Sequence, residues 1–331
     1  MVWQDEVRRL IPENKKIDVV ISPDVDGLLS AAAINARCPV RIAGIYTTRH
    51  VILLGDATMG DARRAMWIDH DISRTDMSCI GQHLTLHNEN DRLPLRSADS
   101  FNPNNFVRQA YRASFKGFAG KGRDKYPFGT VHLLRDAFGL SVPKVGSMAF
   151  AALAHADGSW ATACDYVPNC LWWRDNFYGN NSFITTLQDN YTRSSTALAA
   201  HQWLCNELKD AGVRAAGSRE RASPHIPSAW SNVQGMQSVK FAVRHGSENN
   251  LTSLRKKAAD LRSVAQVLSK VLGTPVPTIA EVREYTSGEY HQIYPNQVPS
   301  SGFDQFMVDN KIFSHAFTAQ NALRYTTGLF D

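Results

Sequence analysis

The chain has 331 residues and a net charge of +5, and its 43% hydrophobic and 20% charged residues describe an ordinary soluble globular protein. No apolar run approaches the roughly 18 residues that span a bilayer, so we expect no membrane partner. The five cysteines are odd in number and share no Cys-x-x-Cys spacing, which argues against a disulfide framework or a structural zinc site. Acids occupy the N-terminal segment where a signal peptide would be basic and then apolar, so we expect a cytoplasmic protein.

The first part of the chain predicts short strands that alternate with helices or turns. A short amphipathic helix is predicted over 2–16, a buried strand over 17–21, and a Leu/Ala-rich helix from Gly27 through Ala36. Further strands are predicted over 40–46, 51–54, 65–68 and 83–87. This alternation indicates an α/β fold, with a mostly parallel, doubly wound sheet of about five strands and helices on both faces.

The rest of the chain predicts mainly helices and loops. An exposed basic loop is predicted over 116–129 and a long loop over 217–235, while helices are predicted over 130–138, 146–156, 195–208 and 251–272. The tail from Pro295 is aromatic-rich and contains no recognisable motif. Because the composition changes after Asn169, we expect two domains, over 1–170 and 171–331, with a mixed or helical second domain and a substrate cleft between them.

Acidic residues follow three of the predicted strands. Asp24 and Asp26 follow the first strand, Asp56 follows the strand over 51–54, and Asp69-His70-Asp71 follows the strand over 65–68. Ligands of open α/β sheets bind outside the carboxyl ends of the strands, and crowded carboxylates there repel one another unless a cation or proton joins them. A single acid at such a place is usually a helix cap, so Asp24 and Asp26 have two interpretations: metal ligands, or caps of the helix that starts at Gly27.

Four short motifs in order give the chain a family resemblance. They are SPDVDG at 22–27, LLGDAT at 53–58, WIDHD at 67–71 and ALAHADG at 152–158, with an asparagine-proline turn, FNPNN, at 101–105. This order resembles the DHH phosphoesterases, which include RecJ-type single-strand exonucleases, NrnA-type oligoribonucleases and cyclic-dinucleotide phosphodiesterases. The resemblance covers roughly the first half of the chain.

The resemblance implies a site that hydrolyses phosphodiesters with a metal-activated water. The substrate would be a nucleotide or a short single-stranded nucleic acid, and the mild positive charge of the chain favours such a partner. One or two Mn²⁺ or Mg²⁺ ions would be bound, Asp56 would bridge them, and Asp71 would lie near the substrate phosphate. Asp69 would support its neighbour. The implied metal ligands are Asp24, Asp26, Asp56, His70 and Asp157.

Two positions depart from the family pattern. Ser22 stands where the first motif usually has histidine, and Asp71 stands where the naming motif has its second histidine. The glycine-rich, histidine-containing loop of many family members is also missing from the C-terminal half. Three hypotheses follow: an active enzyme with altered metal use, a degenerate protein that binds nucleotide or nucleic acid without cleaving it, and a structural subunit with a vacant crevice.

Overall fold

The fold is given by a computed structural model. It describes residues 2–88, 90–92, 95–107, 125–179, 182–191, 199–200, 203–204, 206–207, 210, 250–294, 297–299, 302–318 and 322–330. The predicted loop over 217–235, most of the basic loop over 116–129 and much of the predicted helix over 195–208 lie outside these residues. Among the helices it describes, none is long and apolar enough to cross a membrane.

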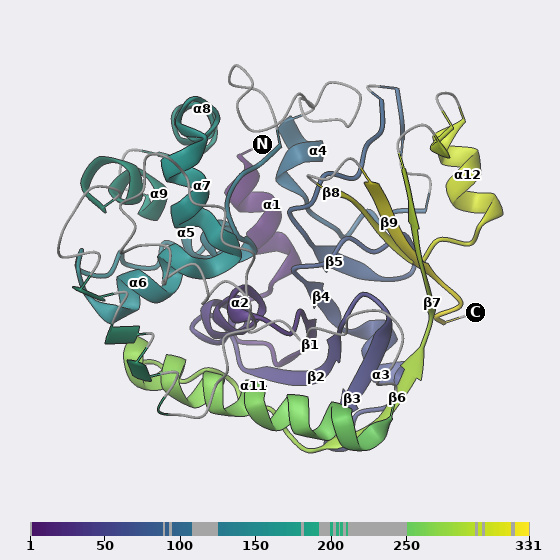
Figure 1. Ribbon diagram of the computed structural model, residues 1–331, viewed down its shortest axis with the longest axis horizontal. Coiled ribbons are helices and arrows are strands. Elements are labelled where there is room, and N and C mark those ends of the chain that lie inside the picture. Colours follow the sequence, from purple (N-terminus) through teal and green to yellow (C-terminus); the bar gives the residue numbers. More distant parts are fainter. Residues whose placement is uncertain are drawn as a thin grey trace.

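A six-stranded sheet forms the centre of the molecule, in the order β5-β4-β1-β2-β3-β6 (Figure 1). β5, β4, β1 and β2 are parallel to one another, and β3 and β6 form antiparallel pairs. The strands are β1 (Ile17–Ile21), β2 (Val40–Tyr46), β3 (His50–Leu54), β4 (Met66–Ile68), β5 (Ser78–Ile80) and β6 (Val282–Ser287). The α/β prediction is therefore confirmed with six strands instead of five, while the doubly wound arrangement stays a prediction.

Two strand predictions need correction. β3 runs antiparallel to β2, because the chain reverses through Thr47, Thr48 and Arg49 instead of crossing over the sheet. The predicted fifth strand over 83–87 is wrong, and the strand at the edge of the sheet is β5. Leu84 instead forms an isolated bridge with Phe317 and is buried beneath the C-terminal segment, which accounts for its apolar character.

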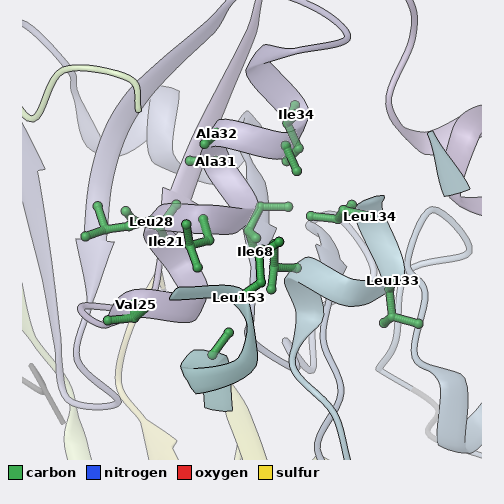
Figure 2. Packing of buried hydrophobic residues seen from close by; sticks show 14 of the residues in the cluster. Ile21, Val25, Leu28, Ala31, Ala32, Ile34, Ile68, Leu133, Leu134 and Leu153 are labelled. Atoms are coloured by element: carbon green, nitrogen blue, oxygen red, sulfur yellow. The ribbon is translucent and has the colours of Figure 1, made fainter. Parts of the chain in front are cut away.

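Helices cover one face of the central sheet. The apolar side chains of α2 pack between the sheet and the helices that follow later in the chain, as the cluster around Leu28, Ile68 and Leu134 shows (Figure 2). The long helix α11 packs against α6 and α2 and ends at Gly273, as the apolar stripe over 251–272 predicts. The helices around this cluster are α1 (Trp3–Leu10), α2 (Val25–Asn35), α5 (Thr130–Ala137), α6 (Met148–His155), α7 (Ser159–Asp165), α8 (Val167–Phe177), α9 (Phe183–Thr186) and α11 (Leu251–Leu272).

The opposite face is covered by α3 (Met59–Arg64) and by residues near the C-terminus. Val20, Tyr46 and Trp67 point to this face and pack with Phe313 and Leu329. Period-two alternation places Val19 and Ile21 on the other face, within the helical cluster. Three further helical segments are short: α4 (Pro103–Val107), η2 (Ala156–Gly158) and η3 (Leu187–Tyr191).

A second, three-stranded antiparallel sheet has the order β7-β9-β8. Its strands are β7 (Glu289–Ile293), β8 (Ser314–Thr318) and β9 (Ala322–Thr327), and α12 (Phe303–Asp309) packs on it through Phe303 and Met307. The predicted domain boundary at residue 170 falls inside α8, and both α11 and β6 from beyond it belong to the first sheet and its core. The tail from Pro295 thus contributes to this second sheet, which the sequence did not indicate.

Candidate functional site

The acids after β1 and β4 gather where these two strands have their carboxyl ends, which we call one edge of the first sheet. β1 and β4 are parallel neighbours, so Asp24 and Asp26 come together with Asp69, His70 and Asp71. Asp69 has a left-handed backbone with φ of 63°, a conformation that aspartate tolerates better than most residues. Its backbone N–H donates to the carbonyl of Ile80, which fixes the turn after β4 against β5.

Asp24 and Asp26 both cap helices, but different ones. Asp24 precedes α2, and its Oδ1 accepts the backbone N–H of Gly27 at 3.0 Å. Asp26 accepts the backbone N–H groups of Thr130 and Val131, at 2.7 and 2.8 Å, in the first turn of α5. Asp26 therefore links α2 to α5 through two hydrogen bonds to otherwise unpaired amides of the first helical turn. The capping interpretation thus describes contacts of both residues, although only Asp24 caps the helix that the sequence suggested.

Ser22 occupies the space between two carboxyl groups. Its Oγ lies 2.8 Å from Asp24 Oδ1 and 2.7 Å from Asp69 Oδ2, and Thr130 Oγ1 donates to Asp69 Oδ1 at 2.9 Å. A hydroxyl has one proton and can donate to only one of the two carboxyl groups. The other short contact is favourable only where a proton or a cation reduces the negative charge of that carboxyl group.

Burial and neighbouring negative charges raise the pKa of two carboxyl groups at this edge, those of Asp26 and Asp69. Burial first, and then the charges of Asp157 and Asp24, raise the pKa of Asp26 to about 8. Burial and the charges of Asp26, Asp24 and Asp157 raise the pKa of Asp69 well above its ordinary value. Four carboxyl groups therefore lie close enough to interact, and a further positive charge among them would be favourable.

His70 has one ring nitrogen ready to accept a ligand. Burial lowers its pKa to about 4, so the imidazole is neutral at pH 7. The ring donates to the backbone carbonyl of Ile21, and Nε2 is buried without a hydrogen-bond partner among the described residues. A metal-binding histidine commonly uses a backbone carbonyl in this way to orient its second nitrogen toward the ion.

Asp71 is held in its charged form by a ring of donors. Burial disfavours its charge, but hydrogen bonds from His83, the charge of Arg96 and the Asn102 amide outweigh burial and lower the pKa of Asp71. Asn102 Nδ2 donates to Asp71 Oδ1 at 2.6 Å, and the His83 backbone N–H donates to Oδ2 at 3.1 Å. A Cβ on Gly81 would lie 2.5 Å from Asp71 Oδ2, so only glycine leaves room for this carboxylate.

The remaining two predicted ligands differ in position. Asp157 is exposed, accepts Gln82 Nε2 at 2.8 Å, and influences the pKa of Asp26 and Asp69, which places it near the cluster. Asp56 lies at the opposite edge of the sheet, where β1 and β2 begin. Its side chain is 87% exposed and is paired with Arg41 at 2.9 Å. The predicted bridging role of Asp56 is wrong for this arrangement, because antiparallel β3 ends at the edge where β1 begins.

The donor chemistry of the cluster fits Mn²⁺ or Mg²⁺ in part. Carboxylate oxygens with one neutral imidazole suit these ions, and the buried Nε2 of His70 is the nitrogen that would bind. As the side chains lie, no three His, Cys, Asp or Glu residues in the described part of the chain are arranged to hold an ion. Asp24, His70 and Asp157 are the predicted ligands that remain available, since both Asp26 oxygens accept α5 amides.

A cavity of about 320 Å³ lies between this edge and the second sheet. Its volume falls within the range of small-molecule sites. Lys125 and Arg324 bring positive charge to the same space as an aromatic ring, that of Tyr290. The lining residues used below are His70, Asp71 and His83 on one side and Tyr290, His315 and Arg324 on the other.

Several residues of the cavity carried no usable sequence signal. His83 and Arg96 lie in or after a segment predicted as a strand, and Tyr290 and Arg324 lie in a second sheet that the sequence did not indicate. The only available hint was the asparagine-proline turn, because Asn102 donates both to Asp71 and to the carbonyl of His83. Comparisons with protein-family models, curated proteins and solved structures gave no match to this chain.

Proposed function

We propose that this protein is a phosphodiesterase that hydrolyses nucleotides or short single-stranded nucleic acids. The observation that supports it best is the cavity between the two sheets. Asp71 and the imidazoles of His70 and His83 line it from the first sheet and its loops, while Arg324 and Tyr290 line it from the second sheet. A phosphodiester needs positive charge for its phosphate and an aromatic surface for its base, and this cavity offers both.

The residues of the chain divide the task between the two sides. Lys125 and Arg324 would neutralise the phosphate, and Tyr290 would contact a base or sugar. Asp71 is paired with Arg96 at 3.8 Å, so its negative charge is balanced before a phosphate enters. The repulsion expected between Asp71 and a phosphate is reduced by this arrangement.

The implied metal would be held by Asp24, His70 and Asp157 only if their side chains rearrange, because as they lie they do not form a set that could hold an ion. When bound, an Mn²⁺ or Mg²⁺ ion supplies positive charge for the phosphate and lowers the pKa of a water molecule. The crowded carboxyl groups favour such an ion, because a cation would reduce the repulsion that raises the pKa of Asp26 and Asp69.

A second candidate function is binding of a nucleotide without cleavage. The position of Asp56 favours it, because the bridging carboxylate of the family pattern is absent from the cluster. The Ser22 hydroxyl also contacts both Asp24 and Asp69, so the protein itself supplies a hydrogen-bond donor to these carboxyl groups. Under this hypothesis the cavity retains affinity for phosphate but the site lacks turnover.

One experiment separates the two functions. Wild-type protein and the Asp24→Asn variant are incubated with short single-stranded DNA and RNA, dinucleotides and polyphosphate, in Mn²⁺ or Mg²⁺. Binding is measured in parallel by fluorescence anisotropy with labelled oligonucleotides. Turnover that Asp24→Asn abolishes supports the phosphodiesterase, and binding without turnover supports the second function. Equal turnover by both proteins contradicts the assigned site.

A further inference from the structure

We propose that His83, oriented by Asp71, is the proton-transferring residue of this cavity and replaces the imidazole that the family motif would place at position 71. The inference rests on the proposed phosphodiesterase function and adds a catalytic residue to it. His83 Nδ1 lies 3.3 Å from Asp71 Oδ2, and His83 lines the cavity with a 34% exposed side chain. Residue 83 thus supplies the imidazole that residue 71 would supply in the family pattern, and the Asp71 carboxylate contacts the Nδ1 side of that imidazole.

The position of His83 is fixed from several directions. Asp71 Oδ2 accepts the His83 backbone N–H at 3.1 Å, and Asn102 Nδ2 donates to the His83 carbonyl at 2.8 Å. Asn102 also donates to Asp71, so the same two residues hold the backbone and the ring. Asn104 Nδ2 adds a second contact to that carbonyl at 3.3 Å. A rigid surrounding of this kind is what a positioned acid–base residue needs.

The other two imidazoles that line the cavity are less suited to proton transfer. His315 uses both ring nitrogens, at 2.9 Å from Ser73 Oγ and 2.9 Å from the carbonyl of Thr85. His70 is buried, and its ring faces Tyr46 with centroids 4.9 Å apart. His83 combines a carboxylate at Nδ1 with access to the cavity, which leaves Nε2 for a ligand.

The chemical step follows from this orientation. With its Nδ1–H donated to Asp71, His83 accepts a proton at Nε2 from the attacking water, whose oxygen forms the new bond to phosphorus. The bond from phosphorus to the leaving oxygen breaks on the opposite side of phosphorus, that oxygen takes a proton from solvent, and His83 then releases its proton to solvent. Asp71 stabilises the intermediate imidazolium, as a carboxylate does in a serine–histidine–aspartate triad. The charged or titratable groups that line the cavity with this ring, or contact Asp71 behind it, are Asp71, Arg96, His70, His315, Lys125, Arg324, Tyr46, Tyr290 and Tyr325.

The first test compares His83→Gln, Asp71→Asn and a control, His291→Gln, by steady-state kinetics. His291 stacks on Tyr325 in β9 and does not line the cavity, so its replacement tests the loss of an imidazole elsewhere. We expect kcat to fall by about 10²–10⁴ in His83→Gln with KM changed by less than about threefold. The pH dependence of kcat should also lose one limb in His83→Gln and keep it in His291→Gln.

A second measurement uses nitrogen NMR of the histidine rings, with inorganic phosphate as the probe. Phosphate should shift Nε2 of His83 and leave His291 unchanged, and Asp71→Asn should alter the tautomer of His83. Wild-type turnover with full kcat in His83→Gln overturns this inference alone. Absence of turnover by the wild type overturns the proposed function and the inference together. Absence of a phosphate shift at His83 overturns the assignment of its ring to the cavity.

Discussion

Aspartates lie at both edges of the central sheet, where β1 ends and where β1 begins, but they are more deeply buried at the first edge and closer to water at the second. At one edge Asp26 and Asp69 are buried, share neighbours of like charge and have raised pKa values. At the other edge Asp18 and Asp56 flank Arg41, and Asp56 is largely exposed. Water and the Arg41 guanidinium balance the charge at this second edge, whereas at the first edge burial and mutual repulsion raise the pKa of the carboxyl groups. Aspartate at a strand end therefore has no fixed role, since strand direction and burial decide it.

The largest expected difference between the edges is in activity. Asp24→Asn removes a carboxylate from the crowded edge and should lower kcat on the order of 10²–10³-fold, as loss of one charge-stabilising group commonly does. Asp56→Asn removes an equal charge from the opposite edge, about 16 Å of strand away, and should change kcat by less than about twofold. Initial rates of the two variants on one oligonucleotide check this. Equal losses in both would show that the edges act together.

The next effect concerns the space around Asp71. Gly81→Ala would place a Cβ 2.5 Å from Asp71 Oδ2 and from the His70 carbonyl, so it should destabilise the fold by about 1–3 kcal/mol. Gly179→Ala is the matched control, because a Cβ there meets no atom within 4 Å. Urea denaturation of both variants measures the difference. An unaltered midpoint in Gly81→Ala would show that the turn relaxes freely.

The crowded edge should also make stability depend on pH in the presence of a chelator. Asp26 titrates at about 8 in the folded state and near 4 when unfolded, so the folded protein holds the extra proton and stability falls as pH rises toward 8. His70 and His132 are neutral when folded, with pKa about 4, and their opposing contribution is complete above pH 6.5. The fall should therefore appear between about pH 6.5 and 8.

Asp157→Asn sharpens this pH prediction. It removes a charge that raises the pKa of Asp26 and Asp69, while the new amide oxygen can still accept Gln82. The melting temperature of the variant should exceed that of the wild type by about 1–3 °C at pH 8.5 and match it near pH 5. Calorimetry at both pH values decides, and a variant less stable than wild type at pH 8.5 would contradict the electrostatic account.

The smallest effect belongs to the exposed edge. Arg41 lies opposite Asp18 across β1 and β2 and contacts Asp56, both within reach of water. Arg41→Gln should cost only about 0.2–1 kcal/mol, and less at high salt, because solvent weakens exposed ion pairs. Chemical denaturation at low and high salt measures it. A salt-independent loss above about 2 kcal/mol would mean that the pair is more important than its exposure indicates.

The sequence predicts well those elements whose conformation is determined by the local pattern of their own side chains. β1, β2 and α11 appear within a residue of their predicted bounds, because continuous β-branched runs and a helical apolar stripe determine them locally. The direction of β3 was not predictable in this way. Its reversal occurs at Thr48, whose φ is 67°, and threonine gives none of the turn signal that glycine or asparagine would.

The candidate site shows the same limit. The acids Asp24, Asp26 and Asp69 could be found from their positions after apolar strands, but the contacts of Ser22 and Thr130 with these acids depend on distances between separate elements. The alternation in residues 83–87 predicted a strand, yet it reflects Leu84 packing against Phe317 of a distant sheet. The strand prediction gave no reason to single out His83, because its proposed role depends on the loop that Asn102 holds through the His83 carbonyl.

The pairing of β3 with β6 has a consequence for biosynthesis. Residues 50–54 emerge from the ribosome early, but their partner at 282–287 emerges more than two hundred residues later. At about 5–20 residues per second, the nascent chain exposes an unpaired strand edge for roughly tens of seconds. Such an edge can pair with another chain, so chaperone capture during translation should protect the yield of folded protein.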